Sequence, residues 1–250
     1  MTCNALEWQA AEGGGKIIES DKTISVNNPR AIRAWERARK WIGRISPPGV
    51  TAYQERDSQN VFDSGRAAFN RIWLGRGISR SEQGRQNYWR TSRSVVNTGF
   101  SSIPGGSAGS AATVGGFGLA VSAHSQHRRE AVSYLLFLIR AQVRLGEVSP
   151  HSGSEPKPLD GPPRVDPHSQ FEQAMQSGGN LVDRPAVETG KNYRRVSEAY
   201  AAAVHSVLTG QKSAQEAAGH LEAQLIEMTG FQPARSGKRA RRESPRNESE

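Results

Sequence analysis

Three glycines and a phenylalanine stand close together in residues 111–125, which read AATVGGFGLAVSAHS. Glycine-rich loops bind phosphate through backbone N–H groups, so a phosphate site is the first chemistry to consider. No Gly-Lys-Ser/Thr sequence follows these glycines, and the spacing of a dinucleotide-binding turn fails at Val121. The stretch therefore indicates a turn before a strand or the edge of a binding cleft, and not a phosphate site.

Histidine and serine patterns indicate no catalytic or metal site. His124 and His127 are three residues apart, but arginines stand beside them at a loop or helix start, which disfavours metal ligation. No Gly-x-Ser-x-Gly turn for a nucleophilic serine is present. The sequence therefore predicts a protein that is not an enzyme and that has no metal and no cofactor.

Aromatic residues at strand ends and in loops are the remaining candidates for binding, namely Trp73, Tyr88, Trp89 and Phe117. The axial C–H groups of a pyranose pack on an aromatic ring, while nearby polar side chains bind its hydroxyls. Aromatic residues at strand ends also fill protein cores. These residue types alone leave both interpretations open.

Basic residues exceed acidic ones, 33 to 24, giving a formal net charge of +9. The alternative function is therefore a basic nucleic-acid-binding protein that uses the arginine-rich stretch between Arg30 and Arg93 and the terminal KRARR segment. However, the arginines are dispersed, and no aromatic-interleaved motif for RNA or DNA accompanies them. We favour solvent-exposed charge and expect no nucleic-acid partner.

The ends and apolar runs of the chain carry little information on location. Cys3 is the single cysteine, which excludes an intrachain disulfide. No signal-peptide pattern is visible at the amino terminus. The longest apolar run, residues 134–139, is far shorter than the ~20 residues that span a bilayer.

Periodicity in residues 13–93 predicts a small number of elements. Residues 13–29 indicate two short strands around a turn at 20–22. Asn28 and Pro29 then suit the start of a helix that continues to Ile45. A short helix follows over 57–64, and residues 66–73, RAAFNRIW, are typical of a buried strand.

The rest of the chain predicts strands followed by helices. Strands are expected in residues 94–106 and 113–123, and a helix over 126–145 that is apolar enough to be buried on several sides. A short helix is expected at 170–176, and two amphipathic helices come last. The second of these begins with the capping-box sequence SAQE at Ser213 and ends at Gly230. Residues 232–250 are expected to be disordered.

The order of these segments resembles a known family. The segments are FDSGRAAFNRIW, SSIPGG, TVGGFGLAVSAHSQHRREAVSYLLFL, RPA and VLTGQKSAQEAAGHLEAQLIEMTGF, preceded by ALEWQAAEGGGKIIESDKTISVNNPRAIRAWERARKWIG. In this order they are similar to the carboxyl-terminal half of family 1 extracellular solute-binding proteins of the maltose and trehalose type. The resemblance covers about residues 4–231.

The resemblance implies an α/β fold of the type II periplasmic-binding-protein kind, two-lobed, with most of the amino-terminal lobe missing and a helix-rich carboxyl-terminal lobe. Residues 1–93 would form the first part of the carboxyl-terminal lobe. Residues 94–145 would complete the amino-terminal lobe, and residues 146–231 would return to the carboxyl-terminal lobe.

The resemblance also implies a function and a site. The chain would be the substrate-binding component of an ABC importer, binding a disaccharide or oligosaccharide between lobes and contacting permease subunits as a monomer. Trp73, Gly116 and Phe117 match cleft positions of the family, and Phe117 stands where many relatives have tryptophan. Arg184 matches an arginine that reaches ligand hydroxyls, with a salt bridge inside the lobe as the alternative.

Location and completeness follow from the same resemblance. The family is periplasmic or extracytoplasmic, whereas a chain without a signal peptide would stay cytoplasmic. The sequence begins in the middle of the family's pattern, so we expect a truncated receptor that binds sugar poorly.

Overall fold

The computed structural model describes residues 1–73, 101–115, 119–144 and 179–234, and its contacts divide the chain into two units. Unit 1 comprises Met1–Ala52, Ile103–Val114 and the chain from Gly179 onward, and unit 2 comprises Tyr53–Ser102 and Gly115–Gly178. The chain thus passes from unit 1 to unit 2 and back twice. The lobe boundaries at residues 93 and 145 stay a prediction.

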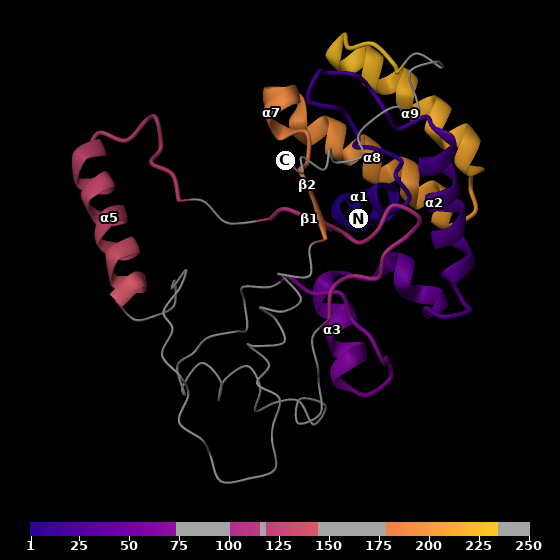
Figure 1. Ribbon diagram of the computed structural model, residues 1–250. Helices are drawn as coiled ribbons and strands as arrows, with labels where there is room; N and C mark the ends of the chain where they lie inside the picture. The colour runs from indigo at the N-terminus through magenta and orange to yellow at the C-terminus, as the bar shows by residue number, and fades with distance from the viewer. Residues whose placement is uncertain (74–100, 116–118, 145–178, 235–250) are drawn as a thin grey trace, which may run out of the picture. The chain divides into compact units, whose positions relative to one another are not determined.

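Unit 1 is built mainly of helices, with a short two-stranded parallel sheet at one side (Figure 1). Its elements are α1 (Thr2–Ala11), α2 (Pro29–Trp41), the 3-10 turns Pro48–Ala52 and Gly190–Asn192, β1 (Ala111–Thr113), β2 (Asn180–Val182), α7 (Ala186–Thr189), α8 (Tyr193–Leu208) and α9 (Ala214–Thr229). β1 and β2 pair in parallel, with Ala111 opposite Asn180. This pairing joins segments that lie far apart in the sequence.

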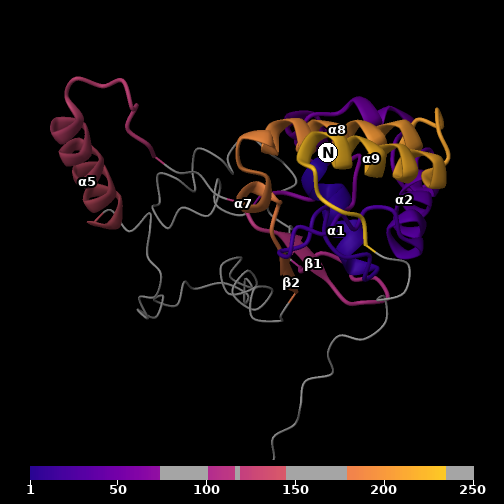
Figure 2. The same ribbon diagram turned by 90° about the horizontal axis from the view of Figure 1, so that it is seen from above.

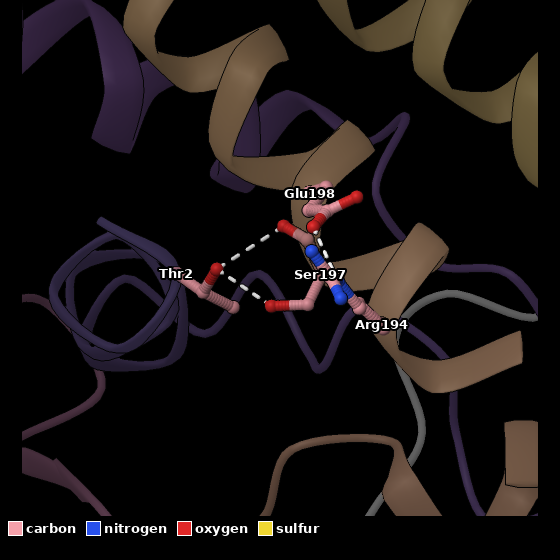
Figure 3. Close-up of polar contacts among 4 residues, drawn as sticks. All are labelled: Thr2, Arg194, Ser197 and Glu198. Atoms are coloured by element: carbon pink, nitrogen blue, oxygen red, sulfur yellow. Dashed lines mark hydrogen bonds and ion pairs between the residues drawn. The ribbon is translucent and has the colours of Figure 1, made fainter. Parts of the chain in front are cut away.

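Helix α1 lies at the centre of unit 1, where it contacts α2, α8 and both strands (Figures 1 and 2). Trp35 of α2 and Tyr200 of α8 are both fully buried and meet edge to face, with ring centroids 5.8 Å apart. The start of α1 is joined to α8 by a polar contact, because Thr2 Oγ1 lies 3.1 Å from the Ser197 carbonyl and 2.9 Å from Ser197 Oγ (Figure 3). The sequence analysis did not predict α1.

Capping residues fix the ends of α2 and α9, as predicted. The Asn28 side chain accepts hydrogen bonds from the backbone N–H groups of Arg30 and Ala31. Ser213 Oγ accepts from the Glu216 N–H, and Gly230 ends α9 in the left-handed region with φ 72°. Each cap supplies a partner or a backbone conformation that the helix end requires.

The predicted end of α2 at Ile45 is wrong. The helix ends at Trp41 because Ile42 is extended, with ψ 124°. Residues 44–46 then turn back, and their N–H groups all donate to the Trp41 carbonyl at 3.0 Å.

Four predicted strands are wrong or shorter than expected. Residues 66–73 form no strand, and Phe69 is 93% exposed. Of the described residues in the strand predicted at 113–123, only Thr113 lies in a strand, the end of Ala111–Thr113, and Leu119 is 60% exposed. In residues 13–29 the expected hairpin is reduced to a single bridge between Ile18 and Ile24. A strand needs a hydrogen-bonding neighbour. Among the described residues, 66–73 pair with no other segment, Ala111–Thr113 pair with β2, and Ile18 and Ile24 make only isolated bridges.

Unit 2 contains two described helices, α3 (Glu55–Asp63) and α5 (Arg128–Arg144). Both occur where helices were predicted, but the expected burial of α5 is wrong. Tyr134, Phe137 and Ile139 are 61%, 63% and 48% exposed. The apolar side chains described on α5 therefore have few packing partners in the described chain.

The carboxyl-terminal prediction is wrong for its first residues. Ile24 bridges Pro233, its N–H donates to the Gln232 carbonyl, and its own carbonyl accepts from the Ala234 N–H. Residues 235–250, 170–176 and 94–100, where disorder, a short helix and the first part of the strand at 94–106 were predicted, lie outside the described residues. Residues 101–106 form no strand, and Gly106 makes only an isolated bridge to Gly109. No helix in the described part of the chain is long and apolar enough to cross a membrane.

Candidate functional site

Trp73 is held by polar groups of unit 2. Its indole Nε1 donates a hydrogen bond of 2.7 Å to Oε1 of Glu55, the first residue of α3. The Arg71 guanidinium lies over the indole ring, 4.0 Å from its centroid. The side chain remains half-buried, so part of the indole is available to a ligand. The cluster therefore presents a half-exposed apolar ring beside a carboxylate and a guanidinium, which are hydrogen-bonding groups.

Gly115 makes the space that the Trp73 ring occupies. A Cβ atom at position 115 would lie 2.4 Å from Trp73 Cζ3, 3.0 Å from Cε3 and 3.1 Å from Cη2. Side-chain atoms do not approach this closely without a shift. Position 115 must therefore lack a side chain if Trp73 is to keep this orientation.

The sequence analysis predicted Gly116 and Phe117 as cleft residues, and it did not predict a role for Gly115. Gly116 and Phe117 lie outside the described residues, so their predicted part in the cleft stays a prediction. Glu55 was not predicted at all. The sequence shows only that Glu55 stands near the start of a predicted helix. Many surface carboxylates occupy such positions, so the position does not indicate a binding site.

Arg184 lies in unit 1, between β2 and α7, and is half-buried. The Arg184 carbonyl accepts from the Ala186 N–H at 2.7 Å. Within the described ranges its guanidinium forms no ion pair, so the alternative of a salt bridge inside the lobe finds no partner there. Arg184 and Trp73 belong to different units.

A buried carboxylate fixes the end of β1, just before the chain enters unit 2. Glu7 is 2% exposed, and its Oε1 accepts from the Thr113 N–H at 3.0 Å. The Thr113 hydroxyl donates to the Cys3 carbonyl at 3.1 Å, and the Val114 N–H donates to the Val182 carbonyl at 3.0 Å. These bonds hold the segment that leads directly to Gly115.

A second buried polar group supports the loop after α1. Gln9 Nε2 donates to the carbonyl of Lys16 at 2.7 Å, and its Oε1 accepts from the Tyr200 hydroxyl at 3.0 Å. Burial raises the pKa of the Tyr200 hydroxyl well above its ordinary value, so this group stays protonated and remains a donor. Sequence reasoning missed Glu7 and Gln9, because an isolated Glu or Gln on a short helix is usually exposed.

The described residues contain no group of three or more His, Cys, Asp or Glu that could hold a metal ion. An open hollow at the start of α5 is lined by His124, Arg128 and Glu130, among others. No described side chain there is arranged for catalysis or ligation. The Trp73 cluster is therefore the candidate site of the described chain.

Comparison with known proteins agrees with the resemblance found in the sequence. Residues 4–144 match the family described as bacterial extracellular solute-binding protein. The chain belongs to this family.

Relatives of this solute-binding protein include a probable ABC transporter-binding protein of Deinococcus radiodurans. The two are 34% identical over 236 residues, which make up 92% of this chain and 54% of the relative. The chain thus spans about half the length of the curated relative.

Solved solute-binding proteins share the fold. A maltose-bound protein of T. maritima, MalE3, superposes with a TM-score of 0.68 at 24% identity, over 90% of this chain and 57% of the other. A protein of Listeria monocytogenes in complex with cycloalternan gives a TM-score of 0.60 at 17% identity, over 93% and 58% of the two chains. A protein of Agrobacterium radiobacter in complex with ribitol gives 0.61 at 18% identity, over 90% and 56%.

The similarities to these solved structures and to the family identify the fold. The chain has the fold of part of a two-lobed solute-binding protein and is rich in helix. Nothing in the comparisons supports the nucleic-acid alternative.

Proposed function

We propose that this solute-binding protein carries part of a sugar-binding surface and serves an ABC importer outside the cytoplasm. It would act as a monomer, present its ligand to permease subunits and catalyse no reaction. The observation that carries the proposal is the arrangement of Glu55, Arg71 and Gly115 around Trp73.

The chemistry of this cluster suits a pyranose. The indole offers an apolar surface, and its orientation is fixed because Glu55 accepts the Nε1 proton and Gly115 leaves room for the ring. Preorganisation of this kind reduces the entropy lost on binding. The second oxygen of Glu55 has no partner among the described residues, so it is free to accept from a sugar hydroxyl.

The ligand class follows from the shape of the ring platform. A flat indole packs against the C–H face of a ring sugar better than against an acyclic polyol. Two structural neighbours are complexes with maltose and cycloalternan, which are built of such rings, and these ligands support an oligosaccharide. The neighbour in complex with ribitol makes an acyclic polyol the natural comparison ligand.

By the family resemblance, Gly116 and Phe117 would also contact the ligand, and Phe117 stands where many relatives have tryptophan. Arg184 would bind ligand hydroxyls, and its guanidinium forms no ion pair within the described ranges.

Calorimetric titration with maltose tests the proposal. We expect weak, millimolar binding, which Trp73→Ala weakens by about 1–3 kcal/mol, as expected for loss of a contact residue. Trp41→Ala is the matched control, because Trp41 is also half-buried but lies in unit 1, and it should leave the affinity unchanged. Equal affinities of the Trp73→Ala and unmodified proteins would contradict the proposal.

A further inference from the structure

Positive side chains recur along one face of α2 and continue past its end. They are Arg30, Arg33, Arg37, Lys40 and Arg44, spaced three, four, three and four residues apart. The first four lie in one row on the helix, and Arg44 follows in the turn after its end. We call these five residues the basic face of α2. From Arg30 to Lys40 it extends about 15 Å along the helix at 1.5 Å per residue.

The basic face is accessible. The buried residues of α2, such as Ala31, Trp35 and Ala38, point into the core of unit 1 and leave the opposite side of the helix to solvent. Arg30, Arg33, Lys40 and Arg44 are exposed.

Little of this charge is neutralised. Arg37 pairs with Glu12 yet keeps 41% of its side chain exposed. The other four cations form no ion pair with another described residue. Glu36 is the single acidic residue of α2.

Apolar side chains stand at the carboxyl-terminal end of the same face. Trp41 is half-buried, and its ring lies edge-on against Trp8, with centroids 5.6 Å apart, and 5.8 Å from the Arg37 guanidinium. Ile45 is 78% exposed. The turn that closes on the Trp41 carbonyl keeps Arg44 and Ile45 within one turn of the indole. A row of cations thus ends in an indole and an exposed aliphatic side chain.

We propose that the basic face of α2, together with Trp41 and Ile45, docks on a lipid bilayer that contains anionic headgroups. Exposed lysines and arginines are attracted to anionic lipid phosphates. Tryptophan is enriched at membrane–water interfaces, and an aliphatic side chain beside it enters the boundary below the headgroups. This surface would hold the receptor near the membrane independently of its ligand.

The apolar end of the face distinguishes a bilayer from a nucleic acid. A phosphate backbone satisfies the cations but offers no apolar layer for Ile45.

Vesicle flotation with the full chain tests the proposal, using vesicles of phosphatidylcholine alone and of phosphatidylcholine mixed with phosphatidylglycerol. The test variant is Arg33→Gln/Lys40→Gln/Arg44→Gln. The matched control is Arg129→Gln/Lys191→Gln/Arg195→Gln, which removes the same charge from exposed positions elsewhere. Basic residues near the carboxyl terminus are retained in both variants and contribute equally.

We expect binding to the anionic vesicles only, and a decrease of that binding at high salt. The test variant should bind about 100-fold more weakly, on the order of fivefold per charge. The control should change far less, and Ile45→Ser should weaken binding several-fold. Thermal melts should show that all variants are folded.

Three results would overturn the proposal. The test and control variants could weaken vesicle binding equally, or Ile45→Ser could bind as the unmodified chain does. Alternatively, a short DNA duplex could bind in a manner that depends on the basic face while vesicles do not, which would assign the surface to nucleic acid. Because no sugar is present, none of these results depends on the proposed sugar site.

Discussion

The orientation of Trp73 depends on residues from three separate segments of the chain. The tryptophan itself was selected from the sequence, as an aromatic residue at the end of an expected strand and by its match to a cleft position of the family, although that strand is not formed. Glu55 lies 18 residues away and Gly115 much further, and their contacts with the indole arise only on folding. The sequence therefore indicated the aromatic residue of the site, but it did not indicate the distant residues that hold the indole in place.

Gly115→Ala tests whether the space under the indole matters for binding. The new Cβ would fall 2.4 Å from Trp73 Cζ3, so the ring must move. We expect maltose affinity to fall by about 1–3 kcal/mol, as for Trp73→Ala. The losses should not add in the double variant, because both substitutions remove the same platform.

Gly219→Ala is the matched control for this substitution. It adds the same methyl group within α9, where nothing lies within 4 Å of the new atom. It should leave maltose affinity unchanged and raise the free energy of unfolding by about 0.5–1 kcal/mol. If Gly115→Ala also left the affinity unchanged, the packing argument for Trp73 would be wrong.

The buried hydroxyl of Tyr200 predicts a pH dependence of stability. Its pKa is raised by burial in the folded state, whereas the unfolded chain has the ordinary value of about 10. Above that pH the unfolded state binds fewer protons than the folded state, so stability falls as pH rises.

Urea unfolding at about pH 8 and about pH 11 measures this effect. Above pH ~10 the unmodified protein should lose up to about 1.4 kcal/mol per pH unit relative to Tyr200→Phe. Below that pH the difference between the two proteins should be constant. Parallel curves over the whole range would show that Tyr200 titrates normally.

At the scale of elements, local signals predicted the helices better than the strands. Asn28, Ser213 and Gly230 act through neighbours in sequence, so α2 and α9 could be placed from the sequence. The strand expected at 66–73 depends on a partner segment, and its own residues do not show whether one is present. Helix α1 was missed because its apolar residues follow no clear period.

Asn28→Ala should cost more than a helix cap alone. Besides capping α2, the Asn28 amide donates to the carbonyls of Gly14 and Ser25, each at 2.6 Å. We expect unfolding free energy to fall by about 2–4 kcal/mol, the sum of a lost cap and unpaired buried carbonyls. Ser213→Ala, which removes an exposed cap, should cost about 1 kcal/mol. Urea unfolding compares the two, and equal costs would show that the amide bonds to the loop contribute nothing.

At the scale of the whole molecule, the described hydrophobic core belongs to unit 1. Every buried apolar residue in the described ranges comes from α1, α2, α8, α9, β1, β2 or the loops that join them. Helix α5 instead exposes Tyr134, Phe137 and Ile139. Burial of apolar area is the main source of stability, so the two units should differ in their resistance to opening.

Hydrogen exchange followed by mass spectrometry measures this difference. Amides of α1, α2 and α8 should exchange slowly, at rates set by opening of unit 1. Amides of α5 should exchange much faster, because no core is described around it. Equal protection of α5 and α8 would show that α5 is stabilised by contacts beyond those described.

The central claim is that Trp73 forms the sugar platform, and the indole N–H signal of Trp73 in a nitrogen–proton NMR spectrum tests it most directly. Trp73→Phe assigns the signal, and the Trp41 signal serves as an internal reference. Titration with maltose at millimolar concentrations should shift the Trp73 signal progressively and leave the Trp41 signal in place, whereas ribitol should have little effect. An unchanged Trp73 signal with maltose, or an equal shift with ribitol, would contradict this account.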